Sequence, residues 1–384
     1  MKVAVLGYGT VGTGVYSMLS DAPGMEAGPV LVRPGKAVES FMVSDAALIF
    51  GDPTVDAVVE TLGGLDPAYS YGMRTLETGK HFITANKAMV AAHGLELAAL
   101  AREKGAAFLF SAACGGGVPF LHNLALSAET DRIEAVSGIL NGTTNYMLDA
   151  MQRRGLSYGD ALREAQSLGY AESDPTADVS GLDALRKMQL ACAVAFGVLP
   201  QSGMLCEGME HFTAEDVEDI QSRGLVCRLM ARGSRAGESV SAYVEPVLFP
   251  RAAPESSVFT NNNMARYTGK RCGSIVLMGQ GAGRFPTASA VLRDLSAAQQ
   301  GARSMFPENC RAAEADNREA VHSYYIRTGG FAAVRLSLRS VLAQGEVVRA
   351  VTEPMSAEKM HALAQNIRKD GNDLFFAALE EELC

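Results

Sequence analysis

The first 110 residues alternate short apolar runs with longer stretches of helical composition. Apolar runs of the length of buried strands occur at residues 2–6, 29–33, 55–60, 81–84 and 106–110. Between them, residues 67–78 and the Ala- and Leu-rich stretch 88–104 are predicted to be helices. This order of strands and helices predicts an α/β domain built on a parallel sheet.

The pattern changes after a glycine cluster at 115–117. Beyond it a strand is predicted over 132–140, and a helix is predicted over about 158–168. Between these, the polar turn 141–146 opens an amphipathic helix, and its amides and hydroxyls could bind a small polar ligand or simply cap that helix. The last part of the chain predicts, in order, a strand at 323–327, a helix over 331–342, a strand at 346–351 and a helix from about 357.

Composition narrows the class of protein. With 384 residues, 48% hydrophobic and 20% charged, the chain can form two or three domains with sizeable cores. A formal net charge of -9 without a long run of Lys or Arg disfavours nucleic acid or an acidic membrane as the main partner. No apolar run approaches the roughly 20 residues that span a bilayer, and no signal peptide is expected, because the first residues enter a predicted strand at once. A small-molecule substrate and a cytoplasmic location are expected.

Seven cysteines are scattered along the chain without a CxxC pair, so they predict neither a disulfide framework nor a zinc site. Cys114, beside the glycine cluster, is the one placed to act as a nucleophile near a cofactor. No histidine stands near it in sequence, and a small core residue is the favoured interpretation.

A nucleotide-binding signal stands at the N-terminus, where the first strand runs into Gly7-Tyr8-Gly9-Thr10-Val11-Gly12 and then an apolar helix. In a dinucleotide-binding unit the first glycine permits a tight turn, and the second lets the backbone approach a pyrophosphate. The third lets the helix pack closely on the strand, and the helix N-terminus faces the phosphates. A dinucleotide site at residues 7–12 is therefore predicted.

The end of the second predicted strand bears on the choice of cofactor. An NAD-specific site usually carries an acidic residue there for the ribose 2′-hydroxyl, whereas this chain has Arg33 and, shortly after, Lys36. Two cations favour a 2′-phosphate, which predicts NADP(H), with NAD(H) as the alternative. The competing interpretation is that both are ordinary solvated charges.

Two other strand ends, at 61–64 and 84–87, fall on the carboxyl edge of the predicted sheet, where doubly wound folds bind their ligands. Lys87 is therefore a candidate functional residue. The competing interpretation is that a lysine that opens a helix faces only solvent.

Residues 169–187 gather acids and a lysine around the start of a predicted helix. That helix is expected to begin near Val179, with Asp178 as its N-cap. Asp183 and Lys187 stand four positions apart and share one helix face, where a surface ion pair would contribute about 0.3–0.5 kcal/mol. The neighbouring positions are apolar almost all round, which predicts a buried helix and favours a functional role.

Together these segments resemble the homoserine dehydrogenase family. The matching motifs, in the family's order, are the glycine turn at 7–12, Thr84-Ala85-Asn86-Lys87-Ala88, Gly115-Gly116-Gly117-Val118-Pro119, the run from Gly138 to Tyr146, the run from Gly169 to Lys187, and the glycine-rich run from Gly279 to Ala290. The match covers about residues 1–300. It implies an NAD(P)H-dependent, reversible reduction of L-aspartate 4-semialdehyde to L-homoserine in threonine, methionine and isoleucine biosynthesis.

The resemblance also implies a domain order and an assembly. A Rossmann-type dinucleotide-binding domain would occupy 1–115, completed by about 285–310. An α+β catalytic and dimerisation domain would occupy 116–284, and a divergent ACT-like βαβα region would occupy 318–384. A homodimer or homotetramer is expected.

Residue roles follow from the same resemblance. Lys187 and Lys87 would flank the reacting oxygen as candidate proton donors, and Lys187 is preferred. The implied substrate-binding residues are Glu172, Asp178, Asp183 and Thr143. The acids among them would bind the substrate's ammonium group or support its binding. The implied cofactor-binding residues are Gly7, Gly9, Thr10, Val11, Gly12, Arg33, Lys36, Gly63, Lys87 and Gly283.

Some members of the family bind a monovalent cation through backbone carbonyls of one loop. The corresponding residues here are Ser111, Cys114, Gly116 and Val118, so an Na+ site is an expectation. Ser111 replaces a glutamate that the family often has, and Cys114 replaces a small apolar residue. The C-terminal region lacks the residue spacing of an ACT effector loop at 327–331, so no feedback effector is predicted.

Two alternative functions remain open. A dehydrogenase of a related amino-acid aldehyde would keep the glycine turn and the lysines but change the ammonium-binding acids, and Glu172 and Asp183 argue against it. A catalytically dead nucleotide-sensing homologue would have lost Lys87, Lys187 or Asp183, and all three are present.

Overall fold

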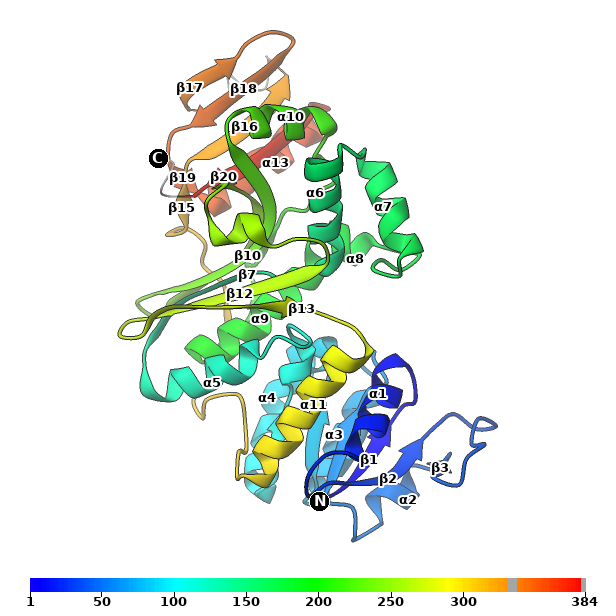
Figure 1. The fold of residues 1–384 in the computed structure, drawn as a ribbon. Helices are drawn as coiled ribbons and strands as arrows, with labels where there is room; N and C mark the ends of the chain where they lie inside the picture. Colours follow the sequence, from blue (N-terminus) through cyan, green and yellow to red (C-terminus); the bar gives the residue numbers. More distant parts are fainter. Residues whose placement is uncertain (330–336, 381–384) are drawn as a thin grey trace. The chain divides into compact units, whose positions relative to one another are not determined.

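The computed structural model describes residues 1–329 and 337–380 (Figure 1). Its residues cluster into two compact units. The first unit comprises Met1–Ile133, Gln189–Leu199 and Gly269–Ala312, and the second comprises Glu134–Met188, Pro200–Thr268 and the described part of Ala313–Cys384. Among the described residues, no helix is both long and apolar enough to cross a membrane.

The sheet of the first unit has the strand order β3-β2-β1-β4-β5-β6. Its strands are β1 (Lys2–Leu6), β2 (Glu26–Leu31), β3 (Met42–Val43), β4 (Ala57–Glu60), β5 (His81–Thr84) and β6 (Phe108–Leu109). Every neighbouring pair is parallel, and the central strands are buried apolar runs because helices cover both faces. The predicted α/β fold with a parallel sheet is confirmed.

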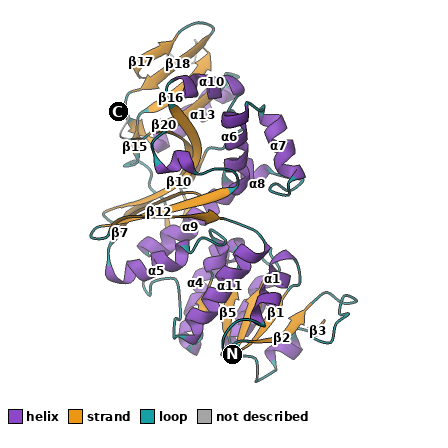
Figure 2. Ribbon diagram, viewed as in Figure 1, coloured by secondary structure: helices purple, strands orange, loops and turns teal. Residues whose placement is uncertain are grey.

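Helices lie beside the strands of this sheet (Figure 2). They are α1 (Thr10–Leu19), α2 (Ala47–Phe50), α3 (Ala68–Glu77), α4 (Lys87–Lys104) and α11 (Arg284–Gln299). The unit also contains α5 (Phe120–Thr130) and the short 3-10 turn η1 (Ser111–Ala113). The late glycine-rich segment returns the chain to this unit, because α11 packs against α1. A Cβ at Gly14 in α1 would lie only 2.8 Å from the carbonyl oxygen of Arg284.

Three strands of this sheet differ from prediction in their boundaries, and one of them, β4, is Ala57–Glu60 and not 55–60. The second strand is Glu26–Leu31 and not 29–33, and only Phe108–Leu109 of the expected run 106–110 is a strand. Parallel partners set these limits, since β2 pairs with β1 from residue 26 onward and β6 pairs with β5 over two residues.

The second unit is organised around a sheet whose path is β12-β7-β10-β11-β20-β16-β18-β17, with β9 pairing β11 beside it. The strands on this path are β7 (Ile133–Ile139), β9 (Leu205–Cys206), β10 (Leu225–Ala236), β11 (Ser239–Pro250), β12 (Asn262–Gly269), β16 (Tyr324–Gly329), β17 (Leu338–Ala343), β18 (Val347–Thr352) and β20 (Leu374–Leu379). The remaining strands are β8 (Val198–Ser202), β13 (Gly273–Gln280), β14 (Arg311–Glu314), β15 (Val321–His322) and β19 (Met355–Ser356), of which β13 pairs with β12.

The second unit also contains several helices, some of which carry the polar residues of the candidate site. They are α6 (Gly142–Arg154), α7 (Tyr158–Ser167), α8 (Thr176–Val179), the first half of α9 (Leu182–Phe196), α10 (Ala214–Ser222), the 3-10 turn η2 (Pro254–Ser257) and α13 (Ala357–Lys369). One face of the sheet forms a buried core with α13, and this core includes Ile139, Met230, Phe249, Met264 and Tyr324.

The C-terminal region departs from the predicted βαβα order. Residues 338–343, in the second half of the helix expected over 331–342, form β17 and pair antiparallel with β18. Residues 331–336 of that predicted helix lie outside the described residues. The expected final helix ends at Lys369, and β20 follows as a buried apolar strand between β11 and β16. Sheet pairing overrides local composition here, and the ACT-like identity of this region stays a prediction.

Candidate active site

The glycine turn of the first unit has the geometry that its sequence predicts. Gly7 has φ +100°, a backbone conformation that favours glycine, and α1 begins at Thr10 directly after Gly9. A Cβ at Gly12 would collide with the carbonyl oxygen of Gly7, whereas one at Gly9 would meet nothing within 4 Å. The three glycines thus serve the turn, the close packing of the helix and an open approach to the backbone.

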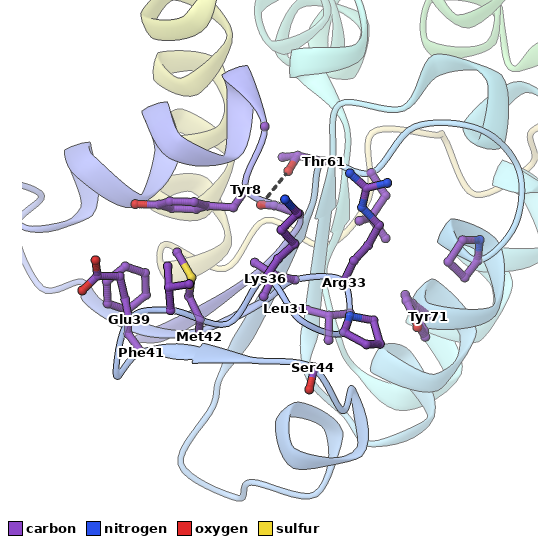
Figure 3. Close-up of a pocket in the computed structure, with 17 residues that line it drawn as sticks. Tyr8, Leu31, Arg33, Lys36, Glu39, Phe41, Met42, Ser44, Thr61 and Tyr71 are labelled. Atoms are coloured by element: carbon purple, nitrogen blue, oxygen red, sulfur yellow. Dashed lines mark hydrogen bonds between the residues drawn. The ribbon is translucent and has the colours of Figure 1, made fainter.

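A cavity of about 1140 Å³ opens at this turn (Figure 3). Arg33 and Lys36, which follow β2, point into it between Tyr8 and Tyr71. Glu39 lines the same cavity, so its wall carries both signs of charge. Its size and mixed lining suit a ligand with apolar rings and anionic groups.

The predicted cofactor residues divide into two sets. Those that line the cavity are Gly7, Gly9, Arg33 and Lys36. The predicted residues outside its lining are Thr10, Val11, Gly12, Gly63, Lys87 and Gly283. Gly283 has φ +124° and stands at the N-cap of α11, which packs on α1.

Glu60 is a buried carboxylate at the carboxyl end of β4 that sequence reasoning missed. Its Oε1 accepts hydrogen bonds from the backbone N–H groups of Leu62 (2.6 Å) and Gly63 (3.1 Å). Its Oε2 accepts one from the Thr84 hydroxyl (2.6 Å), so Glu60 ties together the loops that follow β4 and β5. The signal that could have found it is an acid closing an apolar strand at the ligand-binding edge of the sheet.

Lys87 opens α4 and is partly buried. The preceding Asn86 caps this helix, because its Oδ1 accepts from the backbone N–H of Met89 (3.1 Å). The Asn86 amide also donates to the carbonyl of Gly64 (2.6 Å), which joins the head of α4 to the loop after β4. The backbone position of Lys87 is therefore well fixed at the carboxyl edge of the sheet.

Asn141 is the centre of a polar network in the second unit. It caps α6, since its Oδ1 accepts from the backbone N–H of Thr144 (2.8 Å). Its Nδ2 donates to Asp178 Oδ1 (2.7 Å) and to Asp183 Oδ2 (2.9 Å). The turn at 141–146 is therefore both a helix cap and part of a polar cluster, and the bridging role of Asn141 was not predicted.

Lys187 and Asp183 form a buried ion pair. Each residue is 9% exposed, and Lys187 Nζ donates to Asp183 Oδ2 at 2.7 Å. Lys187 Nζ also donates to the carbonyl oxygen of Leu140 at 2.6 Å. The surface ion pair considered from the sequence is excluded by this burial. A desolvated ion pair contributes little to stability by itself, so its presence in a buried position favours a functional role.

Asp178 is not the N-cap of the helix that was predicted to begin near Val179. It lies inside the short α8, and α9 begins at Leu182. The carboxylate accepts hydrogen bonds from Asn141 and, on Oδ2, from the Thr143 hydroxyl (3.1 Å). Burial raises the pKa of Asp178 and the nearby charge of Asp183 adds to this, whereas the two hydrogen bonds act in the opposite direction.

The structure joins Thr143, Asp178, Asp183 and Lys187 into this network, with Asn141 between them. Glu172 is exposed in the loop before α8, where its backbone carbonyl accepts a hydrogen bond from the Gln166 side chain (3.1 Å). The predicted substrate-binding acids are therefore not equivalent, since two are partly or fully buried and one faces solvent.

The loop at 111–118 is anchored by Asp294 of α11. The Asp294 carboxylate accepts from the Ser111 hydroxyl (2.5 Å) and the Ser111 backbone N–H (2.8 Å). Burial raises the pKa of Asp294 to about 7.

Cys114 is fully buried, in agreement with a core role. Among the described residues, no cluster of three or more His, Cys, Asp or Glu side chains could hold a metal ion.

A glycine turn at the edge of a parallel sheet and a buried lysine paired with an aspartate together define a dehydrogenase of two units. The family model for the NAD binding domain of homoserine dehydrogenase matches residues 7–111, and that for homoserine dehydrogenase matches residues 119–296. The chain is 37% identical over 319 residues to the homoserine dehydrogenase of Synechocystis sp., covering 77% of this chain and 72% of that protein.

Other relatives agree. The homoserine dehydrogenase of Corynebacterium glutamicum is 38% identical over 314 residues, covering 76% of this chain and 70% of that protein. The crystal structure of a homoserine dehydrogenase from Thiobacillus denitrificans matches with a TM-score of 0.87 at 29% identity, covering 99% of this chain and 98% of that one. The chain belongs to the homoserine dehydrogenase family, a family of oxidoreductases, as the sequence resemblance predicted.

Proposed function

We propose that this protein is a homoserine dehydrogenase that interconverts L-aspartate 4-semialdehyde and L-homoserine. The observation that carries the proposal is the buried network of Lys187, Asp183, Asn141 and Asp178. It offers one cation and two carboxylates where two of the family motifs, 138–146 and 169–187, meet. An amino-acid aldehyde needs both, because its ammonium group binds carboxylates and its reacting oxygen needs a proton donor.

Lys187 is the proposed proton donor. When bound, the nicotinamide cofactor supplies the hydride that reduces the aldehyde carbon. The Lys187 ammonium stabilises the negative charge that develops on the oxygen and then donates a proton to it. Its bonds to Leu140 and Asp183 hold Nζ in one orientation, so little reorganisation is needed during the reaction. Lys87 remains the second candidate for this role.

Asp183 and Asp178 are the proposed ammonium-binding residues, with Thr143 supporting them. Asp183 accepts hydrogen bonds from both Lys187 and Asn141, so its carboxylate is oriented at the centre of the network. Asp178 has a raised pKa, and an incoming ammonium group would favour its ionised form. Glu172, exposed before α8, is proposed to contact the same end of the substrate.

The cofactor is proposed to be NADP(H). Arg33 and Lys36 both point into the cavity beside the glycine turn, where a ribose 2′-phosphate would be neutralised. NAD(H) remains the alternative, because Glu39 in the same wall could accept from a 2′-hydroxyl.

A monovalent cation at the loop 111–118 is also proposed. The Ser111 hydroxyl donates to Asp294, and the proposed cation ligands are the backbone carbonyls of Ser111, Cys114, Gly116 and Val118. Oxygen donors of this kind suit a hard cation such as Na+.

The protein is also proposed to form a homodimer or homotetramer, which a measurement of its molecular mass in solution can test.

The reaction can be tested with purified protein. NADPH oxidation should be observed with L-aspartate 4-semialdehyde and should be much slower with succinate semialdehyde, which lacks the amino group. Equal rates with both aldehydes would contradict the proposed role of the acids. NADH, assayed in parallel, tests the cofactor preference separately.

A further inference from the structure

Asn263 of β12 has a side chain whose polar atoms are unpaired. The residue is 2% exposed, and neither Oδ1 nor Nδ2 has a hydrogen-bond partner. Leaving buried polar groups unpaired costs about 1–3 kcal/mol for each group. Because buried amides are otherwise almost always paired, this side chain points to a ligand that supplies the partners.

The place of this side chain follows from the pairing of β12 with its neighbour β7. A Cβ at Gly138 would lie 3.2 Å from Cα of Ala265, and one at Gly142 would lie 2.8 Å from the carbonyl oxygen of Asn261. Residue numbers rise from 138 to 142 in one segment while they fall from 265 to 261 in the other, so the two segments run antiparallel. Between these two contacts, each step forward along residues 138–142 therefore corresponds to one step back along residues 265–261.

This register puts Asn263 opposite Leu140, and Met264 opposite Ile139. Met264 and Ile139 both belong to the core that includes α13, as residues paired across two strands should. Side chains alternate along a strand, so Asn263 and Leu140 turn away from that core. Figure 1 draws α9 on the other side of these strands from α13. Lys187, in α9, donates to the carbonyl oxygen of Leu140.

Hydrogen bonds from α6 fix the segment 258–262, which directly precedes Asn263. The Asn145 Nδ2 lies within hydrogen-bond distance of the carbonyls of three alternate residues that lead into and begin β12, those of Val258 (3.1 Å), Thr260 (3.0 Å) and Asn262 (3.1 Å). Thr260 has φ +58°, a strained conformation for threonine, and its N–H donates to Asp149 Oδ2 (3.0 Å). The unpaired amide therefore occupies a defined position.

We propose that Asn263 is a further substrate-binding residue of the homoserine dehydrogenase reaction, and that its amide binds the reacting oxygen beside Lys187. This inference rests on the proposed function. Nδ2 would donate to the aldehyde oxygen, and in the alcohol complex Oδ1 would accept the hydroxyl proton, so each atom gains a partner in one of the two states of the reaction. A substrate carboxylate would leave Oδ1 unpaired, and Asp178 and Asp183 already serve the ammonium group.

The Asn263→Leu variant tests the assignment, because leucine has a similar volume and no polar atoms. Its thermal stability should equal or exceed that of the wild type, since two unpaired groups are removed. Its kcat for semialdehyde reduction should fall about 100-fold, the effect of losing one donor to a developing oxyanion. NADPH binding should be unchanged. Asn261→Leu, two residues earlier and partly exposed, is the matched control and should keep its kcat.

Other outcomes separate this assignment from the proposed function. An unchanged kcat, or a raised KM with an unchanged kcat, would show that Asn263 does not bind the reacting oxygen. A fall in melting temperature together with kcat would make its role structural. Wild-type protein without semialdehyde activity would overturn the proposed function itself, whereas an active wild type with an unaffected Asn263→Leu variant would overturn this assignment alone.

Discussion

The glycine turn of the first unit and the polar network of the second unit are built in opposite ways. The turn depends on side chains that are absent, because Gly7 adopts a positive φ and Gly12 leaves room for a backbone oxygen. The network depends on side chains that bind one another, with Asn141 between two carboxylates and Lys187 on one of them. Substitution should therefore damage the turn through steric overlap and the network through unpaired charge.

The largest expected effect is at Gly12. In Gly12→Val the added side chain would overlap the backbone of Gly7, so α1 could not keep its place on β1. We expect a clearly lower melting temperature, measured by calorimetry, and much weaker NADPH binding, measured by nucleotide fluorescence.

Gly9→Ala is the control, because a Cβ there meets no atom within 4 Å. It should keep the melting temperature while weakening NADPH binding. A Gly12→Val protein with wild-type stability and NADPH affinity would show that the turn is not constrained sterically.

A second prediction concerns Asn141. Asn141→Ser keeps a good N-cap for α6 but is too short to bridge Asp178 and Asp183. Hydrogen bonds to charged groups contribute about 1.5–3 kcal/mol each, so kcat/KM for the semialdehyde should fall by about 100-fold.

Binding of NADPH by the Asn141→Ser variant should be unchanged, whereas its melting temperature should fall, because Asp178 and Asp183 each lose a hydrogen bond. Asn366→Ser, at an exposed position of α13, provides the control. Equal loss of NADPH binding and turnover would mean that the network does not act on substrate alone.

The third prediction concerns pH and Asp294. Its pKa is about 7 in the folded protein, above the ordinary value of 3.8, so the folded state binds the extra proton between these values. Stability contributed by this group is present at low pH and is lost as pH rises toward 7, by up to about 1.4 kcal/mol per pH unit.

Asp294→Asn cannot ionise, so this part of the pH dependence should disappear from denaturant unfolding curves between pH 5 and pH 8. Asp45→Asn, at an exposed position before α2, is the control. An unchanged slope in the Asp294 variant would place the titration elsewhere.

The smallest expected effect is on cofactor choice. Arg33→Ala and Lys36→Ala should each weaken NADPH binding by about tenfold, because each removes one exposed charge near the expected 2′-phosphate. NADH binding should be nearly unchanged. Parallel loss of both nucleotides would show that these cations serve the shared pyrophosphate or ribose.

The same contrast explains what the sequence could predict. The glycine turn is local, so its spacing and its flanking strand and helix indicate its geometry directly. Lys187 and Asp183 share one helix turn and were also found. Glu60 and Asn263 were not predicted, and for Asn141 only the helix cap or a ligand contact was considered, not the bridge between two acids. The partners of Asn141 and Glu60 lie far along the chain, and the side chain of Asn263 has no partner, so only the fold reveals these relations. Residues 338–343 were wrongly assigned to a helix because pairing with β18 decides their conformation.

The central claim is that the network in the second unit, headed by Lys187, performs the chemistry and leaves nucleotide binding to the first unit. The most direct test measures steady-state reduction of the semialdehyde and the Kd for NADPH in Lys187→Ala, with Lys104→Ala at the exposed end of α4 as control. We predict a loss of kcat of at least about 100-fold with an unchanged Kd. Near-normal turnover in Lys187→Ala would contradict the account.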